Sequence, residues 1–264
     1  MSIGYCRPDS IAEAAALSAA GGRILAGGQS LMPLVNRGEV DAVDLIDINR
    51  LAGLDTIVMR DGFIEIGALA RLESVRRHPL LAARLPMLAT ALAWVANPAI
   101  RLRGTLVGNL VQFAAGAEAV AVAMLSAARL VTPDGRTHAL GALPDASFVT
   151  HVRLDPSPVA TRAGFIEMQR RSGHLGTVGC GVAALPNGAY QVVFSGLLEA
   201  PLPAPVVAAE LARGGHDRSR IATALAHDLA GRTPRSDLHA DAAYRLAVAP
   251  VLVGRVVAQL EAAT

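Results

Sequence analysis

Residues 26–31 read AGGQSL and lie between two apolar runs, ILA at 24–26 and LMPLV at 31–35. Glycine has no Cβ, so adjacent glycines accept positive φ and let a ligand approach the main chain. A strand that ends at such a pair, followed by polar side chains and a helical turn, can point several N–H groups one way and bind a phosphate or diphosphate. An ordinary turn explains the same residues, and the pattern taken alone favours the turn.

A second segment, RGTLVGN at 103–109, has a similar composition, with two glycines, a hydroxyl, an amide and a cation within seven residues. A structural loop is again the default interpretation. Two such loops in one chain could grip the two ends of a large nucleotide. The G-x-G-x-x-G and G-x-x-x-x-G-K-[ST] spacings are absent from the sequence, so a dinucleotide would bind in another way.

Composition narrows the class of protein. The chain has 264 residues, 52% of them hydrophobic, 17% charged, and a net charge of +2, which predicts a globular protein that binds no nucleic acid. The longest stretch without Asp, Glu or Arg, 172–198, contains glycines and Pro186, so we expect strands and turns there and no membrane span. Cys6 and Cys180 are too few for an iron–sulfur cluster or a structural zinc. We expect a cytoplasmic protein with no metal site.

Local patterns predict an α+β order of elements. We expect helices at 10–20, 71–77, 80–95 and 116–127, strands at 23–26 and 43–48, hairpins at 56–68 and 128–140, and irregular structure at 101–110. The composition shifts at 155–164, a plausible domain boundary. Beyond it, we expect strands at 164–170, 177–185 and 189–195, and then three helices over the last 60 residues.

Four segments together resemble the medium, FAD-binding subunit of the molybdenum hydroxylases, the relatives of carbon monoxide dehydrogenase and xanthine dehydrogenase. AGGQSL with LIDINRLAGL (45–54) resembles the first signature of that family, and IRLRGTLVGNL (100–110) falls where its second signature lies. YCRPDSIAEAAAL (5–17) is similar to its opening, and MQRRSGHLGTVGCGVAAL (168–185) resembles the strand pair that opens its C-terminal domain. The resemblance covers nearly the whole chain in the family's order.

The resemblance implies a fold and a domain division. We expect a two-lobed FAD-binding domain of the PCMH type at 1–158, with lobes at about 1–54 and 55–158 and the cofactor between them. A C-terminal domain of the carbon monoxide dehydrogenase flavoprotein type, at 162–264, would pair a three-stranded antiparallel sheet with a helical bundle.

The resemblance also implies a set of FAD-binding residues. They are Leu25, Ala26, Gly27, Gly28, Gln29, Ser30, Leu31, Arg103, Gly104, Thr105, Gly108, Asn109 and Glu118. The glycine loops would hold the diphosphate, and the Glu118 carboxylate would accept from a ribose hydroxyl. We expect no catalytic acid, base or nucleophile in this chain.

The implied function is electron transfer. The chain would be the flavoprotein component of an oxidoreductase, taking electrons from a small iron–sulfur subunit and passing them to a terminal acceptor, while a large molybdopterin subunit oxidises the substrate. A dimer of such heterotrimers is expected.

Some positions depart from the family pattern and leave alternatives open. Val107 replaces a glycine of the second signature, Gln112 and Ala114 replace its following His and Asp, and His174 replaces an Asp of the C-terminal motif. A β-branched residue tolerates positive φ poorly and fills space. We favour retained FAD because the AGGQS loop is intact. The alternative is an assembly or scaffold subunit that has lost or weakened FAD binding, and a third is a stand-alone flavin oxidase or reductase that uses NAD(P)H.

Overall fold

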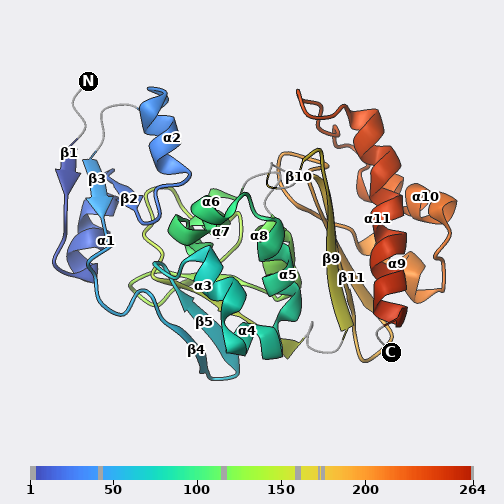
Figure 1. Ribbon diagram of the computed structural model, residues 1–264, viewed down its shortest axis with the longest axis horizontal. Helices are drawn as coiled ribbons and strands as arrows, with labels where there is room; N and C mark the ends of the chain where they lie inside the picture. Colours follow the sequence, from blue (N-terminus) through green and yellow to red (C-terminus); the bar gives the residue numbers. More distant parts are fainter. Residues whose placement is uncertain are drawn as a thin grey trace. The chain divides into compact units, whose positions relative to one another are not determined.

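The computed structural model describes residues 4–40, 44–113, 118–157, 162–171, 173 and 176–262. The chain divides into two compact units (Figure 1). The first unit comprises residues 1–78, 98–112 and 128–154, and the second comprises 79–97, 113–127 and 155–264. The middle of the sequence therefore alternates between the two units.

A small parallel sheet opens the first unit. Its strands are β1 (Gly4–Cys6), β3 (Asp44–Asp47) and β2 (Arg23–Leu25), in that order. Helix α1 (Ile11–Ala19) contacts β2 and β3. The expected helix at 10–20 and the expected strands at 23–26 and 43–48 are confirmed.

Side-chain caps account for the start of α1. The hydroxyl of Ser10 accepts from the amide of Glu13 at 3.1 Å, and the Glu13 carboxylate accepts from the amide of Asp9 at 2.8 Å. These bonds satisfy donors that a helix start leaves without partners.

A five-stranded antiparallel sheet forms the rest of the β-structure of the first unit. Its order is β4 (Ile57–Arg60), β5 (Phe63–Gly67), β8 (His151–Leu154), β6 (Arg129–Val131) and β7 (Thr137–Ala139). The expected hairpins at 56–68 and 128–140 are confirmed. Asp61 and Gly62 have φ values of 50° and 83°, as a tight two-residue hairpin turn requires.

Four further helices of the first unit are α2 (Leu31–Asn36), α3 (Leu72–Arg77), α6 (Pro98–Arg103) and α7 (Leu106–Gln112). The prediction of irregular structure at 101–110 is wrong, because α6 and α7 fill this segment except for residues 104–105. The Thr105 hydroxyl accepts from the Gly108 amide at 3.1 Å and caps α7. Gly104 therefore lies between two short helices, and Gly108 lies within the second of them.

A four-stranded antiparallel sheet is the centre of the second unit. Its order is β12 (Leu202–Pro203), β11 (Tyr190–Ser195), β10 (Gly176–Ala184) and β9 (Arg162–Gln169). The three expected strands are confirmed. The sheet has a short fourth strand, β12, whose two residues are too few to show a sequence pattern. Every residue of β10 is buried, because helices cover both faces of the sheet.

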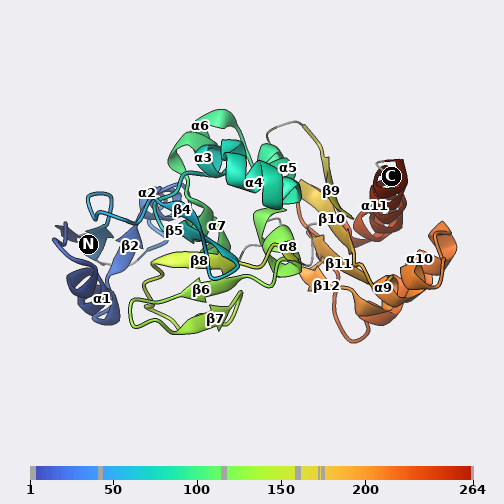
Figure 2. The same cartoon turned by 90° about the horizontal axis from the view of Figure 1, so that it is seen from below.

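The helices of the second unit form two groups around this sheet (Figure 2). Helices α9 (Pro205–Ala212), α10 (Arg218–Asp228) and α11 (Ala242–Ala262) confirm the three expected helices. The other group contains α4 (Pro79–Arg84), α5 (Pro86–Trp94) and α8 (Glu118–Leu125). The single helix expected at 80–95 is wrong because Pro86 has no amide donor and starts a new helix.

Helix α11 is the one helix in the described ranges that is long and apolar enough to cross a membrane by length and composition. Ala249, Leu252, Val253 and Val256 on this helix are buried, and the helix packs against β9 and β10. This packing is that of a core helix.

A buried arginine joins α11 to the sheet. Arg245 is 1% exposed, and its guanidinium donates to the carbonyls of Thr177 and Gly196, the latter at 2.9 Å. It also donates to the carboxylate of Asp237 at 2.7 Å. A buried charge is tolerated only when it is paired and hydrogen bonded in this way.

We predict that Arg245→Met lowers the free energy of unfolding by about 3–5 kcal/mol, because it leaves two buried carbonyls without their side-chain donor and removes the buried cation that pairs with Asp237. Urea denaturation measures this change. The control is Arg255→Met on the exposed side of the same helix, for which we expect a change within about 0.5 kcal/mol. Equal effects of the two variants would contradict the role of Arg245.

Candidate functional site

The two glycine loops meet backbone to backbone in the first unit. A Cβ on Gly27 would lie 2.4 Å from the carbonyl oxygen of Arg103 and 2.8 Å from the Cα of Gly104. No side chain fits such a gap, so position 27 requires glycine for close approach. The structure thus brings together the two segments that the sequence singled out.

Asn49 orients the first peptide groups of the AGGQSL loop. Its side-chain amide donates to the carbonyls of Leu25, at 3.3 Å, and Ala26, at 2.9 Å. The C=O and N–H of one trans peptide point in opposite directions. Holding the Ala26 carbonyl therefore aims the Gly27 amide away from Asn49.

The next peptide groups are oriented by the loop itself. The side-chain amide of Gln29 donates to the carbonyl of Gly27 at 3.3 Å, and the Met32 amide donates to the carbonyl of Gly28 at 3.0 Å. Gly28 has a φ of 71°, a conformation that favours glycine. These bonds fix the directions of the Gly28 and Gln29 amides.

Four consecutive amides of this loop are left without an acceptor. Among the residues that the structure describes, no group accepts from the amides of Gly27, Gly28, Gln29 and Ser30. Consecutive main-chain N–H groups that precede a helix form a binding site for an anion. The loop has the donors and the bare backbone that a diphosphate requires.

Two arginines add positive charge beside the loop. Burial first, and then the nearby charge of Arg103, lower the pKa of Arg71 below its usual range. The positive charge of Arg103 thus repels that of Arg71, whose guanidinium donates to the Arg103 carbonyl at 2.6 Å. An anion bound near them would relieve this repulsion.

Helix α7 carries residues 106–109 of the second loop. The Oδ1 atom of Asn109 is buried and has no hydrogen-bond partner among the described residues, which is unusual for a native polar group. Such an acceptor suits a ligand that donates to it.

The Val107 side chain is 3% exposed, and Val107 has no positive φ. The concern that valine would be forced into positive φ is removed, because a regular helix accepts valine.

Glu118 lies at the start of α8 in the second unit, and its side chain is 4% exposed. Its electrostatic neighbour is Glu167 on β9, which is also 4% exposed and accepts from the side-chain amide of Gln169 at 2.8 Å. Burial raises the pKa of Glu118 to about 7. Burial, together with the charge of Glu118, raises the pKa of Glu167 to about 9. The pair is a buried acidic site that holds protons at neutral pH.

The first unit contains all the residues expected to bind FAD except Glu118, whose contact with a ribose stays a prediction. Of the departures from the family pattern, Gln112 ends α7, while Ala114 and His174 lie outside the described residues.

Sequence reasoning missed Asn49 and Arg71 as members of the site. Asn49 lies two residues after the end of β3 within the LIDINRLAGL signature, and its place in that signature was the available signal. Arg71 had no local signal, since its partners Asn49 and Arg103 lie 22 and 32 residues away.

Arg101 precedes the second glycine loop and is paired with a carboxylate. It donates to the carboxylate of Glu73 at 3.0 Å, and Arg76 and Arg77 bind the same carboxylate. The bond from Arg76, followed by those from the other two arginines, lowers the pKa of Glu73 to about 2. This cluster joins α3 to α6 and thereby supports the second glycine loop.

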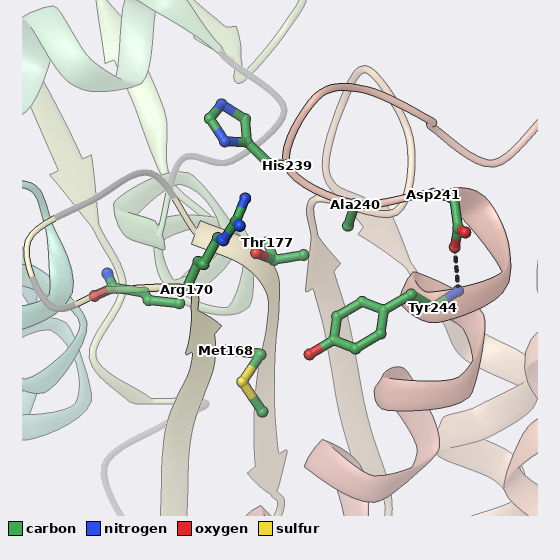
Figure 3. A pocket seen from close by; sticks show the side chains of 8 residues that line it. Met168, Arg170, Thr177, His239, Ala240, Asp241 and Tyr244 are labelled. Atoms are coloured by element: carbon green, nitrogen blue, oxygen red, sulfur yellow. Dashed lines mark hydrogen bonds between the residues drawn. The ribbon is translucent and has the colours of Figure 1, made fainter.

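An open cavity of about 330 Å³ lies in the second unit (Figure 3). Met168, Thr177, His239 and Tyr244 are among its lining residues. None of the residues predicted to bind FAD lines it. Over the described ranges, no group of three or more His, Cys, Asp or Glu side chains could hold a metal ion.

The two loops meet at Gly27, and the amides of residues 27–30 have no acceptor among the described residues, an arrangement typical of anion-binding sites. Residues 1–157 match the family model described as "FAD binding domain in molybdopterin dehydrogenase". The chain belongs to this family, and it is an FAD-binding medium-type subunit of the molybdenum hydroxylases, a class of oxidoreductases.

Curated relatives agree with this assignment. The carbon monoxide dehydrogenase medium chain of Hydrogenophaga pseudoflava is 27% identical over 95% of this chain and 94% of its own length. The 6-hydroxypseudooxynicotine dehydrogenase complex subunit alpha of Paenarthrobacter nicotinovorans is 35% identical over 65% of this chain and 63% of its own length.

Solved structures extend the similarity to the whole fold. A chain of the Cu,Mo-CO dehydrogenase matches with a TM-score of 0.89 and 26% identity, covering 100% of this chain and 99% of that chain. A chain of quinoline 2-oxidoreductase from Pseudomonas putida 86 matches with a TM-score of 0.87 and 27% identity, covering 98% and 97%. The α+β fold expected from the sequence is confirmed.

We predict that Gly27→Ala weakens FAD binding at least about tenfold, or about 1.4 kcal/mol, because the new methyl group must push the two loops apart. Fluorescence titration of the apoprotein with FAD measures the dissociation constant. Gly254→Ala in α11, where a Cβ would meet nothing within 4 Å, is the control and should bind FAD as the wild type does. Unchanged affinity of Gly27→Ala would show that the close approach does not matter for the cofactor.

We predict that Glu167→Gln makes the protein more stable at pH 8 than the wild type, with a smaller difference at pH 5. A carboxyl whose folded pKa is raised contributes its full stability below the unfolded pKa, and this contribution falls as pH rises through the folded pKa. For this pair the loss runs from about pH 4.5 through about 7 and 9. Urea denaturation at both pH values should show the difference between variant and wild type growing by at least about 1.4 kcal/mol, the equivalent of one pKa unit. A difference that does not change with pH would contradict the buried acidic pair.

Proposed function

We propose that this chain binds FAD through its two glycine loops and transfers electrons within a heteromeric molybdenum hydroxylase. The amides of Gly27, Gly28, Gln29 and Ser30 would hold the diphosphate. Asn109 would accept a hydrogen bond from the cofactor, and Arg103 would supply positive charge. FAD supplies the redox chemistry, because a flavin accepts electrons one at a time and releases them singly or in pairs.

The four amides without acceptors are the observation that carries this proposal. Backbone donors that are already oriented need no rearrangement when an anion arrives. The Gly27 contact with the second loop supports the same conclusion, because it places both family signatures at one site. The remaining residues predicted to contact FAD lie on these loops, at the end of β2 or at the adjoining starts of α2 and α7: Leu25, Ala26, Leu31, Gly104, Thr105 and Gly108.

The partners follow from what the chain lacks for a complete reaction. Its two cysteines, Cys6 and Cys180, are free thiols, so clusters that feed electrons to the flavin must belong to another subunit. We propose a small iron–sulfur subunit and a large molybdopterin subunit, assembled as a dimer of heterotrimers. The similarity to carbon monoxide dehydrogenase medium chains supports this arrangement.

A cytoplasmic location and a division into domains at 1–158 and 162–264 are part of the same proposal.

An assembly subunit without FAD is the competing function. It was raised by four departures from the family pattern, Val107, Gln112, Ala114 and His174, and the regular geometry of Val107 in α7 weakens the first of them. A stand-alone enzyme that oxidises NAD(P)H is tested directly by adding these nucleotides to the isolated chain.

We predict that the purified chain shows the visible absorption of an oxidised flavin and releases one FAD per chain on denaturation. In the complex purified from its source, the substrate should bleach this absorption under anaerobic conditions, and the isolated chain should not respond. A colourless protein that ignores added FAD would support the assembly role. A flavin in the complex that stays oxidised while substrate is consumed would contradict electron transfer through this chain.

A further inference from the structure

Arg71 joins the two glycine loops through atoms that do not belong to the predicted FAD contacts. One guanidinium nitrogen donates to the Arg103 carbonyl at 2.6 Å, and the other donates to the Oδ1 atom of Asn49 at 2.7 Å. The Asn49 side-chain amide in turn donates to the carbonyl of Ala26 at 2.9 Å. The bridge therefore runs from the second loop to the first through Arg71 and Asn49.

The bridge acts where the two main chains touch. Gly27 lies one residue after the carbonyl that Asn49 holds, and its Cα faces the carbonyl oxygen that Arg71 binds. The geometry fixes two properties together: the separation of the loops and the direction of the Gly27 amide. Both must be correct before several donors can reach one diphosphate.

A second set of hydrogen bonds holds the Asn49 side chain in place, and it involves residues at β3 and β1. The Asp47 carboxylate accepts from the side-chain amide of Asn49 at 2.7 Å and from its main-chain amide at 3.0 Å. The other oxygen of Asp47 accepts from the hydroxyl of Tyr5, and Arg7 donates to that hydroxyl at 2.8 Å. The Tyr-x-Arg start of the chain thereby gains a physical role, because it keeps Asn49 in place.

We propose that Arg71 is a positioning residue. Through its bonds to Asn49 and to the Arg103 carbonyl, it sets the separation of the two glycine loops and the direction of the Gly27 amide. This inference rests on the proposed binding of FAD by the two loops. Arg71 needs its planar guanidinium, because two nitrogen atoms must reach a main-chain carbonyl and a side-chain oxygen at once. A lysine at position 71 carries the same charge but places only one nitrogen there.

The test measures FAD dissociation constants for the full-length apoprotein by fluorescence titration. We expect Arg71→Met and Arg71→Lys each to weaken FAD binding at least tenfold, and Asn49→Ala to do the same. Because the two residues act through one bridge, the double variant Arg71→Met/Asn49→Ala should be no more than about threefold weaker than either single variant. The control is Arg136→Met, which removes an exposed arginine paired only locally with Asp134 in the same unit; it should bind FAD as the wild type does.

The outcomes separate this inference from the proposed function. If the wild type does not bind FAD, the proposed function fails before Arg71 is tested. If the wild type binds FAD and Arg71→Lys matches it, Arg71 acts through charge alone and the positioning role is overturned. Additive losses in the double variant would also overturn it. Thermal melting of each apoprotein checks that it folds, and if Arg71→Met does not fold, Arg71→Lys and Asn49→Ala decide the question.

Discussion

The close contact between Gly27 and the backbone at Arg103 and Gly104 is the constraint on which the site depends. A backbone carbonyl occupies the place where a Cβ would stand. Two segments that are about 75 residues apart in the sequence can meet this closely only if neither has a side chain in the way. Once they meet, the bonds from Asn49, Gln29 and Met32 turn the carbonyls inward and leave the opposite amides available to a ligand.

Local sequence patterns predicted the parts of the fold that local chemistry controls. The helix that Ser10 caps, the hairpin that turns at Asp61-Gly62 and the three strands expected in the second unit all appear at their expected places. The failures at 80–95 and 101–110 have local causes as well. Pro86 starts a helix instead of lying within one, and Thr105 caps a helix that two glycines seemed to forbid.

The site was only partly predictable, because its supporting contacts join distant residues. The glycines have a composition signal and Asn49 lies in a family signature, but no local pattern predicts that Arg71 bridges the two loops. The same holds for Glu118, whose partner Glu167 lies on a strand 49 residues further along. Val107 illustrates the opposite case. A departure from a family signature appeared to threaten cofactor binding, yet the residue lies in a regular helix with its side chain buried.

The most direct test of this account is a crystal structure of the chain with FAD bound. The account predicts that the diphosphate accepts hydrogen bonds from the amides of Gly27 to Ser30, while Asn49 and Arg71 keep the contacts described above. A diphosphate held elsewhere, with these amides bonded to the protein's own groups, would contradict it.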